Sequence, residues 1–350
     1  MKDISVLIID DSAFIRQMLS EMLSEDPEIN VVGTAFDPFD GREKIKKLNP
    51  DVITLDVEMP KMDGLTFLEK IMSLRPMPVV MISTLTGKGT DTAIRALQIG
   101  AVECIGKPEQ KTPQALQEFA AELCLAVKKA AGAKMGIKNY SNKAIKRPSI
   151  PINLKRVVSA HAPKLIAIGA STGGVETLSD ILPHLPDNLP PIVITQHMPP
   201  VFTDSFARRI SASCAFPVYE AADGMELKRG MACIAAGGKQ LMIIEKYGKF
   251  ICKVTDDPPV NNHKPSVDVM FDSVREILGD AVLAIILTGM GKDGAEGLLR
   301  LRQAGAFTIG QNEASCVVYG MPRAAYEIGA VEKVVSLTDI PDAIIGRCFS

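Results

Sequence analysis

Short apolar runs alternate with amphipathic stretches along the first 127 residues. Five runs rich in valine and isoleucine are nearly continuous in hydrophobicity: Ile4–Ile9, Val31–Ala35, Val52–Leu55, Val79–Ile82 and Val102–Ile105. Such runs are typical of parallel strands that are covered on both faces. Helical patterns such as Ala13–Leu23 and Leu65–Leu74 lie between them. Because successive β-α units connect in a right-handed sense, the pattern predicts a doubly wound parallel sheet.

The same alternation returns from about Lys164 onwards. The apolar runs that suit buried parallel strands are Leu165–Gly169, Ile192–Thr195, Ala281–Leu287 and Ala306–Ile309. Two further runs, Leu241–Glu245 and Phe250–Val254, flank Tyr247-Gly248 as the strands of an antiparallel hairpin would. We therefore expect a second doubly wound α/β domain, mostly parallel, with one antiparallel hairpin.

The hydrophobic pattern stops between these two halves. The amphipathic segment Pro113–Ala131 runs into a stretch that contains glycine, serine and asparagine, followed by Pro148 and Pro151. This composition is typical of a linker. A length of 350 residues also favours about two domains. We expect a first domain over residues 1–127, a basic flexible linker over 128–160 and a second domain over 161–350.

Charge is distributed unevenly over these three parts. Residues 1–127 hold 13 basic and 20 acidic residues, 128–160 hold 9 basic and none acidic, and 161–350 hold 17 basic and 21 acidic. The net charges of −7, +9 and −4 add up to the −2 of the whole chain. The basic run is local, so we interpret it as a solvated tether and expect no nucleic-acid partner.

Cysteines and apolar stretches indicate the compartment. The 7 cysteines are scattered and include no Cys-x-x-Cys pair, which favours a reduced protein over a disulfide framework or a zinc site. The chain has no run of about eighteen apolar residues, and its first residues lack the apolar stretch of a signal peptide. We expect a cytoplasmic protein that is not inserted in a membrane.

Acidic side chains follow the strands of the first half. Asp10 and Asp11 come after the first strand, Asp56 ends the third, and Lys107 follows the fifth. The carboxyl ends of parallel strands share one edge of a sheet, where ligands bind. Converging carboxylates repel one another unless a cation lies between them, and oxygen ligands favour Mg²⁺. Lys107 could neutralise a phosphoryl group, and Ser83, after the fourth strand, could donate a hydroxyl to it.

A serine lies in a glycine-rich turn of the second half. The string Gly169-Ala170-Ser171-Thr172-Gly173-Gly174 follows a strand and precedes a helical stretch from about Val175. Backbone N–H groups at such a helix start can stabilise an oxyanion. A phosphate or nucleotide cradle is the alternative, but the string lacks the lysine of a P-loop and the spacing of a dinucleotide fingerprint.

A serine nucleophile needs a base near pKa 7 and a carboxylate that orients that base. His197 follows the strand that ends at Thr195, and Asp293 lies in the turn after the strand Ala281–Leu287. Of the other three histidines, His161 lies at the end of the expected linker and His184 lies in a loop, so His263 is the rival base. The order Ser-His-Asp differs from that of α/β-hydrolases, which favours an independent arrangement.

The first half resembles the receiver domain of two-component response regulators. The matching strings are Ile8–Ser12, Leu55–Gly64 and Gly106–Pro108. The resemblance implies a flavodoxin-like fold and phosphorylation of Asp56 by a histidine kinase. One position departs from the pattern, because Cys104 stands three residues before Lys107, where receivers often have an aromatic residue.

The same resemblance implies the roles of the other polar residues of the first half. It implies Ser83 as the switch hydroxyl and Lys107 as the cation that senses the phosphate. It also implies Mg²⁺ at the receiver site, held by Asp11, Asp56 and the backbone carbonyl of Glu58, with Asp10 nearby.

The second half resembles the catalytic domain of chemotaxis receptor methylesterases, the CheB family. The strings that carry the resemblance are Gly169–Gly174, Gln196–Pro199, His263–Asp268, Thr288–Gly294 and Tyr319–Pro322. It implies hydrolysis of glutamate γ-methyl esters on chemoreceptors with release of methanol, and deamidation of receptor glutamines. It implies no cofactor for the ester hydrolysis.

The resemblance to this family also implies the site residues. Ser171 would be the nucleophile, His197 the general base and Asp293 the carboxylate that orients it. The backbone amide of Met290 would donate to the oxyanion, and Thr172 would adjoin the site.

Together the two halves predict a catalyst controlled by phosphorylation. We expect the unphosphorylated receiver to block the Ser171 site, phosphoryl-Asp56 to favour the open form, and recruitment of the protein to receptor arrays. The rival hypothesis is a response regulator whose second domain binds DNA or protein. Its support is the receiver and the basic run, but the second half shows no compact helical recognition unit.

Overall fold

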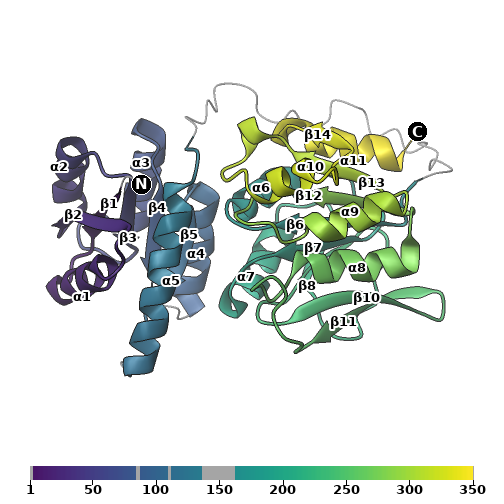
Figure 1. The fold of residues 1–350 in the computed structure, drawn as a ribbon, viewed down its shortest axis with the longest axis horizontal. Helices are drawn as coiled ribbons and strands as arrows, with labels where there is room; N and C mark the ends of the chain where they lie inside the picture. Colours follow the sequence, from purple (N-terminus) through teal and green to yellow (C-terminus); the bar gives the residue numbers. More distant parts are fainter. Residues whose placement is uncertain (1–2, 84–86, 109–111, 136–161, 350) are drawn as a thin grey trace. The chain divides into compact units, whose positions relative to one another are not determined.

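The structure is a computed structural model of the chain. It describes residues 3–83, 87–108, 112–135 and 162–349. The chain divides into two compact units, Met1–Asn139 and Tyr140–Ser350, which are described separately below. Figure 1 shows the secondary structure of both units.

The first unit alternates strands and helices throughout. Its strands are β1 (Ile4–Ile9), β2 (Ile29–Ala35), β3 (Val52–Asp56), β4 (Val79–Ser83) and β5 (Glu103–Gly106). Its helices are α1 (Ala13–Ser24), α2 (Pro38–Leu48), α3 (Gly64–Leu74), α4 (Gly87–Ile99) and α5 (Pro113–Ala131). The five expected strands are therefore present, with ends that differ by at most two residues.

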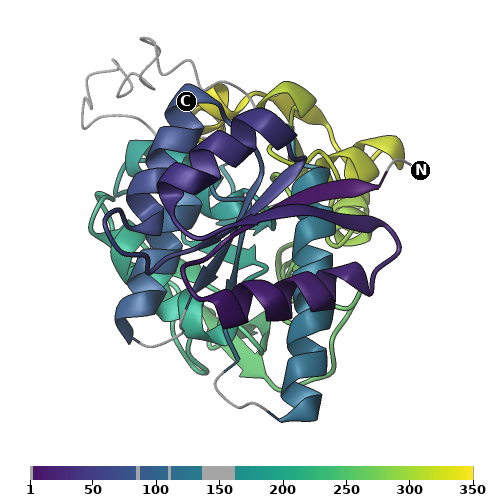
Figure 2. The same ribbon diagram turned by 90° about the vertical axis from the view of Figure 1, so that its left-hand side faces the viewer.

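The five strands form one parallel sheet in the order β2-β1-β3-β4-β5. Helices α1 and α5 contact each other on one face, where Leu19, Leu23, Phe119 and Leu123 enter the core. The remaining helices lie on the opposite face, as Figure 2 shows. This is the flavodoxin-like arrangement that the sequence predicts.

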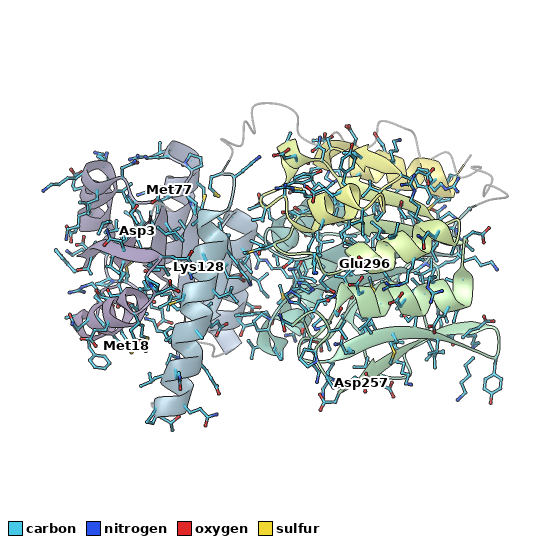
Figure 3. The ribbon with its side chains drawn as sticks, in the orientation of Figure 1. Asp3, Met18, Met77, Lys128, Asp257 and Glu296 are labelled. Carbon is cyan, nitrogen blue, oxygen red and sulfur yellow. The ribbon has the colours of Figure 1, made fainter. Side chains whose placement is uncertain are left out.

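Helix α5 extends past the expected boundary at residue 127. Its bounds match the amphipathic segment Pro113–Ala131, so Lys128 and Lys129, which also fall in the expected linker range 128–160, lie in its last turn. Lys128, labelled in Figure 3, forms an ion pair with Asp26 at 2.8 Å and so belongs to the first unit. The helix ends at Ala131, and residues 136–160 of the expected linker lie outside the described residues.

The described part of the second unit contains nine strands. They are β6 (Leu165–Ala170), β7 (Ile192–Gln196), β8 (Val218–Glu220), β9 (Ala232–Ile234), β10 (Gln240–Lys246), β11 (Lys249–Thr255), β12 (Val282–Ile286), β13 (Phe307–Gln311) and β14 (Lys333–Val335). The sequence pattern missed β8, β9 and β14, because a strand of three residues is too short to show a hydrophobic pattern.

The helices of the second unit complete its α/β pattern. They are α6 (Gly174–Ile181), α7 (Pro200–Ser211), α8 (Val267–Leu278), α9 (Ala295–Gln303), α10 (Met321–Glu327) and α11 (Ile340–Cys348). Three single turns of 3-10 helix occur at Leu182–His184, Glu313–Ser315 and Leu337–Asp339.

Seven strands form a fully parallel sheet in the order β14-β13-β12-β6-β7-β9-β8. The expected hairpin, β10 with β11, is a separate two-stranded antiparallel sheet that packs on α8. Buried residues of α8, α9 and the hairpin share one core with the sheet, among them Phe271, Leu298 and Ile243. Figure 1 shows α8 and α9 lying side by side over this sheet. The predicted fold class is confirmed.

In each of the two parallel sheets, the chain adds strands first on one side of its first strand and later on the other side. In the first unit the resulting switch point lies between β1 and β3, and in the second it lies between β6 and β12. Ligands of doubly wound sheets bind beyond the carboxyl ends of the strands at such points. The fold thus predicts ligand sites at the residues that end or follow β1, β3, β6 and β12.

Candidate functional site

Three aspartates meet at the switch point of the first unit. Asp10 follows β1 and Asp56 ends β3, and these strands pair in parallel with Ile9 opposite Leu55. Each of Asp10, Asp11 and Asp56 offers a carboxylate oxygen within 4.8 Å of the others. Asp10 and Asp56 are buried and Asp11 is exposed. An oxygen-only donor set with one open side fits a hard divalent cation such as Mg²⁺.

Lys107 joins this cluster from the loop after β5. Its ammonium nitrogen lies 2.9 Å from Asp56 Oδ1 and 3.1 Å from Asp10 Oδ2. Although burial opposes the charged form, the hydrogen bond and charge of Asp56, together with Asp10, raise the pKa of Lys107. One lysine facing three carboxylates leaves the cluster negative, which again suits a divalent cation.

The carboxyl of Asp56 is electrostatically unusual. Burial raises its pKa to about 6, the neighbouring Asp10 adds to this rise, and Lys107 only partly opposes it. A carboxylate at this position is therefore held charged at some free-energy cost, which a cation or covalent modification would relieve.

Ser83 is close to Asp56 across the sheet, and Glu58 is close to it along the chain. Ser83 ends β4, which pairs with β3, and its backbone carbonyl accepts a hydrogen bond from Lys107 N at 2.8 Å. Glu58 follows Asp56 by two residues in a loop that folds back tightly. A Cβ at Gly64 would come within 2.0 Å of the backbone oxygen of Asp56, so this loop requires a glycine there.

Cys104 lies inside the sheet of the first unit. It pairs with Met81 of β4 and is 3% exposed. Burial raises the pKa of its thiol, so it is a neutral apolar group at neutral pH. A small buried thiol at this position lacks the rotating ring that the usual receiver pattern provides.

Ser171 is the first residue after β6. Its N–H donates to Thr288 O at 3.0 Å, and its carbonyl accepts from Gly174 N at 2.7 Å, which closes a tight turn into α6. Gly173 has φ +78°, in the left-handed region that favours glycine. A Cβ at Gly174 would lie 2.0 Å from Gln196 Oε1. The two glycines of this turn are thus required by backbone conformation and by close approach.

His197 lies beside Ser171 because β6 and β7 are neighbours. Ala170 pairs with Gln196, and His197 N donates to Ala170 O at 3.1 Å. Gln196 Nε2 donates to Ser171 O at 2.9 Å and to His197 O at 3.0 Å. Gln196 therefore ties the backbones of the two residues together, a role that the sequence pattern missed.

Asp293 completes the constellation from the loop after β12. Its Oδ2 lies 2.8 Å from His197 Nε2. Gly294, with φ +86°, follows it and starts α9, whose first turn holds the Glu296 labelled in Figure 3. Residues from β6, β7 and the β12–α9 loop thus meet beyond the carboxyl ends of neighbouring strands.

Asp293 is fully surrounded by donors. It is 1% exposed, and besides His197 it accepts from Asn261 Nδ2 at 2.9 Å, Ser266 Oγ at 2.7 Å and Val267 N at 2.7 Å. Burial alone would raise its pKa, but the hydrogen bonds from His197 and Asn261 dominate and hold the pKa well below its usual range. Asp293 is consequently a fixed anion.

The second ring nitrogen of His197, Nδ1, is available to accept a proton. His197 Nδ1 is buried and has no hydrogen-bond partner among the described residues. Ser171 Oγ likewise has no hydrogen-bond partner among these residues, so no hydrogen bond joins the two side chains in this structure. Catalytic hydrogen bonds in ligand-free enzymes are often long and tighten only with substrate.

The loop that contains Gly289 and Met290 packs closely against Ser171. A Cβ at Gly289 would lie 2.7 Å from Ser171 Cβ, so only glycine allows this approach. The loop is anchored by Gly289 O, which accepts from Gly320 N and Met321 N at 3.0 and 2.8 Å. Met290 N donates no hydrogen bond within the described residues.

Thr172 adjoins the same loop. Its carbonyl accepts from Thr288 Oγ1 at 3.0 Å, and its own hydroxyl is buried without a hydrogen-bond partner among the described residues. A buried hydroxyl without a partner costs free energy, which a bound substrate oxygen could recover.

The structure places the remaining histidines differently. His263 stacks on His197, with ring centroids 3.8 Å apart and an interplanar angle of 12°. His184 is half-buried in a 3-10 turn, where its Nδ1 lies 2.9 Å from Asp180 O, and His161 lies outside the described residues. The histidine that bonds to Asp293 is thus His197.

Sequence reasoning missed the polar residues that support this site. Gln196, Asn261 and Ser266 all lie within or next to strings that resemble the family, but each also bonds Ser171 or Asp293, which lie 25 to 32 residues away. Contacts at such separations depend on the strand order, which the hydrophobic pattern does not give.

Comparison with known families defines the class of each unit. Residues 6–118 match the response regulator receiver domain, and residues 166–344 match the CheB methylesterase domain. The chain is thus a two-domain response regulator whose second domain is of the methylesterase type. Receiver domains in general are phosphorylated in a Mg²⁺-dependent manner. No helix in the described ranges is long and apolar enough to cross a membrane.

The relatives extend over nearly the whole chain. The protein-glutamate methylesterase/protein-glutamine glutaminase 1 of Caulobacter vibrioides is 50% identical over 99% of this chain and 98% of its own length. The enzyme of the same name from Rhizobium johnstonii is 50% identical over 97% and 95%. The CheB methylesterase catalytic domain of Thermotoga maritima is 39% identical over 53% of this chain and 98% of its own, with a TM-score of 0.52. This chain belongs to the CheB methylesterase family.

Proposed function

We propose that this protein hydrolyses glutamate γ-methyl esters of chemoreceptors, deamidates receptor glutamines and is activated by phosphorylation at Asp56. The observation that carries the hydrolytic part is the hydrogen bond between His197 and Asp293 at the strand ends beside Ser171. The names of the relatives support the substrate, and the receiver match supports the control.

The proton path follows from the ring orientation. Because His197 Nε2 faces Asp293, its Nδ1 is the atom that would accept the proton of Ser171 Oγ. The serine oxygen forms a bond to the ester carbonyl carbon, and the bond to the methoxy group breaks. Methoxide takes the proton from His197 and leaves as methanol, and a water molecule then cleaves the glutamyl-serine ester by the same steps.

Asp293 and the surrounding amides would stabilise charge during these steps. The fixed anion of Asp293 stabilises the imidazolium that forms on His197. We assign the developing oxyanion to the N–H of Met290 and the hydroxyl of Thr172, because neither donor has a partner among the described residues. Loss of one such donor typically costs about 3–4 kcal/mol of transition-state stabilisation.

In the receiver, Asp56 would accept the phosphoryl group of a histidine kinase. Asp11, Asp56 and the backbone carbonyl of Glu58 would hold Mg²⁺, with Asp10 nearby, and the cation would neutralise charge on the transferred phosphoryl group. Lys107 would then contact the phosphoryl oxygens, and Ser83 would donate its hydroxyl to them. This change would favour an open form in which the Ser171 site is accessible, in a protein recruited to receptor arrays.

Mass spectrometry of methylated receptor peptides tests the hydrolytic proposal. The full chain should shift each methyl-glutamate peptide by a loss of about 14 Da, the difference between ester and acid, and should convert glutamine to glutamate with a gain of about 1 Da. Ser171→Ala should produce neither change. Unchanged peptides with the wild-type protein and a phosphodonor would contradict the proposal.

A further inference from the structure

A tight turn between β11 and α8 lies against two members of the proposed triad. The turn consists of residues 260–263, called here the asparagine turn. Val260 N donates to His263 O at 3.0 Å and His263 N donates to Val260 O at 2.9 Å. Its two central residues, Asn261 and Asn262, have φ +53° and +64°. This conformation is favourable for asparagine and matches the twist of a two-residue hairpin turn.

The first central residue of the asparagine turn bonds two buried carboxylates. Asn261 Nδ2 lies 2.9 Å from Asp293 Oδ1 and 2.7 Å from Asp268 Oδ2. A primary amide has two N–H donors, so one side chain can satisfy both acceptors. Asp268 is held in turn by Gly297 N at 2.6 Å. Asn261 therefore separates two negative groups and fixes the position of Asp293.

The last residue of the turn covers the proposed base. The His263 ring is nearly parallel to the ring of His197, at a centroid distance of 3.8 Å. The backbone of His263 is anchored by the turn itself and by Gln240 Nε2, which donates to His263 O at 3.3 Å. One face of the His197 ring is thus covered by the His263 ring, and hydrogen bonds fix the backbone that carries the His263 ring.

We propose that the asparagine turn is a positioning element for catalysis, which holds Asp293 through Asn261 and the ring plane of His197 through His263. The proposal rests on the proposed function, because it assigns a role toward the same triad. The hydrogen bond to Asp293 fixes the position of His197 Nε2, but it leaves the ring free to rotate about the direction of that hydrogen bond. Stacking by His263 restrains this rotation and keeps Nδ1 directed toward the substrate side.

Two substitutions separate a role of His263 in ring stacking from a role in proton transfer. His263→Ala removes the stacked ring, and we expect kcat to fall about tenfold while KM changes less than twofold. His263→Phe restores a flat ring without a titratable group, and we expect it to recover most of the lost kcat. If His263→Phe is as impaired as His263→Ala, or if His263→Ala keeps more than half of the wild-type kcat, the stacking role is wrong.

The asparagine turn supplies its own matched control for Asn261. Glycine tolerates a left-handed backbone, so Asn261→Gly and Asn262→Gly change the same turn with the same backbone preference. The side chain of Asn262 has no hydrogen bond in the described part of the chain. We expect Asn261→Gly to lower kcat at least fivefold and Asn262→Gly to stay within twofold of wild type. Equal losses in both variants would contradict the role of the amide.

A second readout separates this proposal from the proposed function. Covalent labelling of Ser171 by a fluorophosphonate probe reports on the triad without any receptor substrate. The labelling rate should fall in His263→Ala and recover in His263→Phe. If the wild-type protein labels at Ser171 but leaves methyl esters intact, the proposed substrate is wrong and the positioning role stands. If all these variants label at the wild-type rate, the positioning role is wrong.

Discussion

Two buried aspartates, Asp56 and Asp293, occupy equivalent places beside the two parallel sheets, but their pKa values are shifted in opposite directions. Asp56 is the last residue of β3 and Asp293 lies in the loop after β12, so each lies at the carboxyl end of a parallel strand beside a switch point. The pKa of Asp56 rises to about 6, whereas that of Asp293 is held well below its usual range.

The neighbours explain this difference, since both groups are buried. Asp56 faces the carboxylate of Asp10 and shares a single cation, Lys107, with it. Asp293 accepts hydrogen bonds from His197, Asn261, Ser266 and the backbone of Val267. A carboxylate short of donors is suited to take up a cation or a phosphoryl group, and one saturated with donors is suited to orient a base.

Removal of the nucleophile should give the largest effect. Ser171→Ala should lower methylesterase activity by up to about 10⁶-fold, because triad members act as a unit. Its receiver should still accept phosphate from a small phosphodonor, since the substitution lies in the other unit. Methanol release from methylated receptor measures the first effect and labelling with radioactive phosphodonor the second. Activity within tenfold of wild type would show that Ser171 is not the nucleophile.

Exchange of the carboxylate in the second unit should give the next largest effect. Asp293→Asn keeps the shape but removes the anion, and the corresponding change in serine protease triads costs about 10⁴ in kcat. The matched substitution Asp56→Asn should leave the rate without phosphodonor within a few-fold of wild type. The two kcat values in the absence of phosphodonor test the contrast, and equal losses would contradict it.

The two histidines of the second unit should differ strongly. His197→Ala removes the proposed base and should be about as inactive as Ser171→Ala, whereas His263→Ala should lose only about tenfold. Single-turnover rates with the same methylated peptide measure both. A more severe loss in His263→Ala would show that His263 is the base.

The pH dependence of stability should carry opposite signs for the two aspartates. The pKa of Asp56 is raised on folding, so the folded receiver binds this proton more tightly and loses stability as the pH rises from about 4 to 6. The pKa of Asp293 is lowered, so its contribution is present above about 3.9 and is lost as the pH falls.

Asp56→Asn should therefore stabilise the protein at pH 7 relative to pH 4. The gain should be at most about 3 kcal/mol, since a shift of one pKa unit corresponds to about 1.4 kcal/mol. Thermal unfolding of wild type and variant in the presence of EDTA measures it, and Mg²⁺ should reduce the difference. A variant that is less stable than wild type at pH 7 would contradict the raised pKa.

Much of the architecture follows from the hydrophobic pattern, because long buried strands such as Ile4–Ile9 and Leu165–Ala170 have an unmistakable composition. The polar residues at their ends follow from the rule that ligands bind there, so Asp56, Ser171 and His197 could be named as candidates. Asn261 and Gln196 could not, because their partners are set by strand order and by turns. The short strand β9 could not be predicted, because three residues are too few to show a hydrophobic pattern.

We propose that phosphorylation of the buried Asp56 controls catalysis at Ser171. Initial rates of methanol release from methylated receptor, measured with and without a small phosphodonor in the presence of Mg²⁺, test it most directly. We expect an increase of at least about tenfold in the wild-type protein and no increase in Asp56→Ala. A tenfold increase corresponds to a shift of about 1.4 kcal/mol in the equilibrium between closed and open forms. Equal rates for the two proteins under both conditions would contradict the proposal.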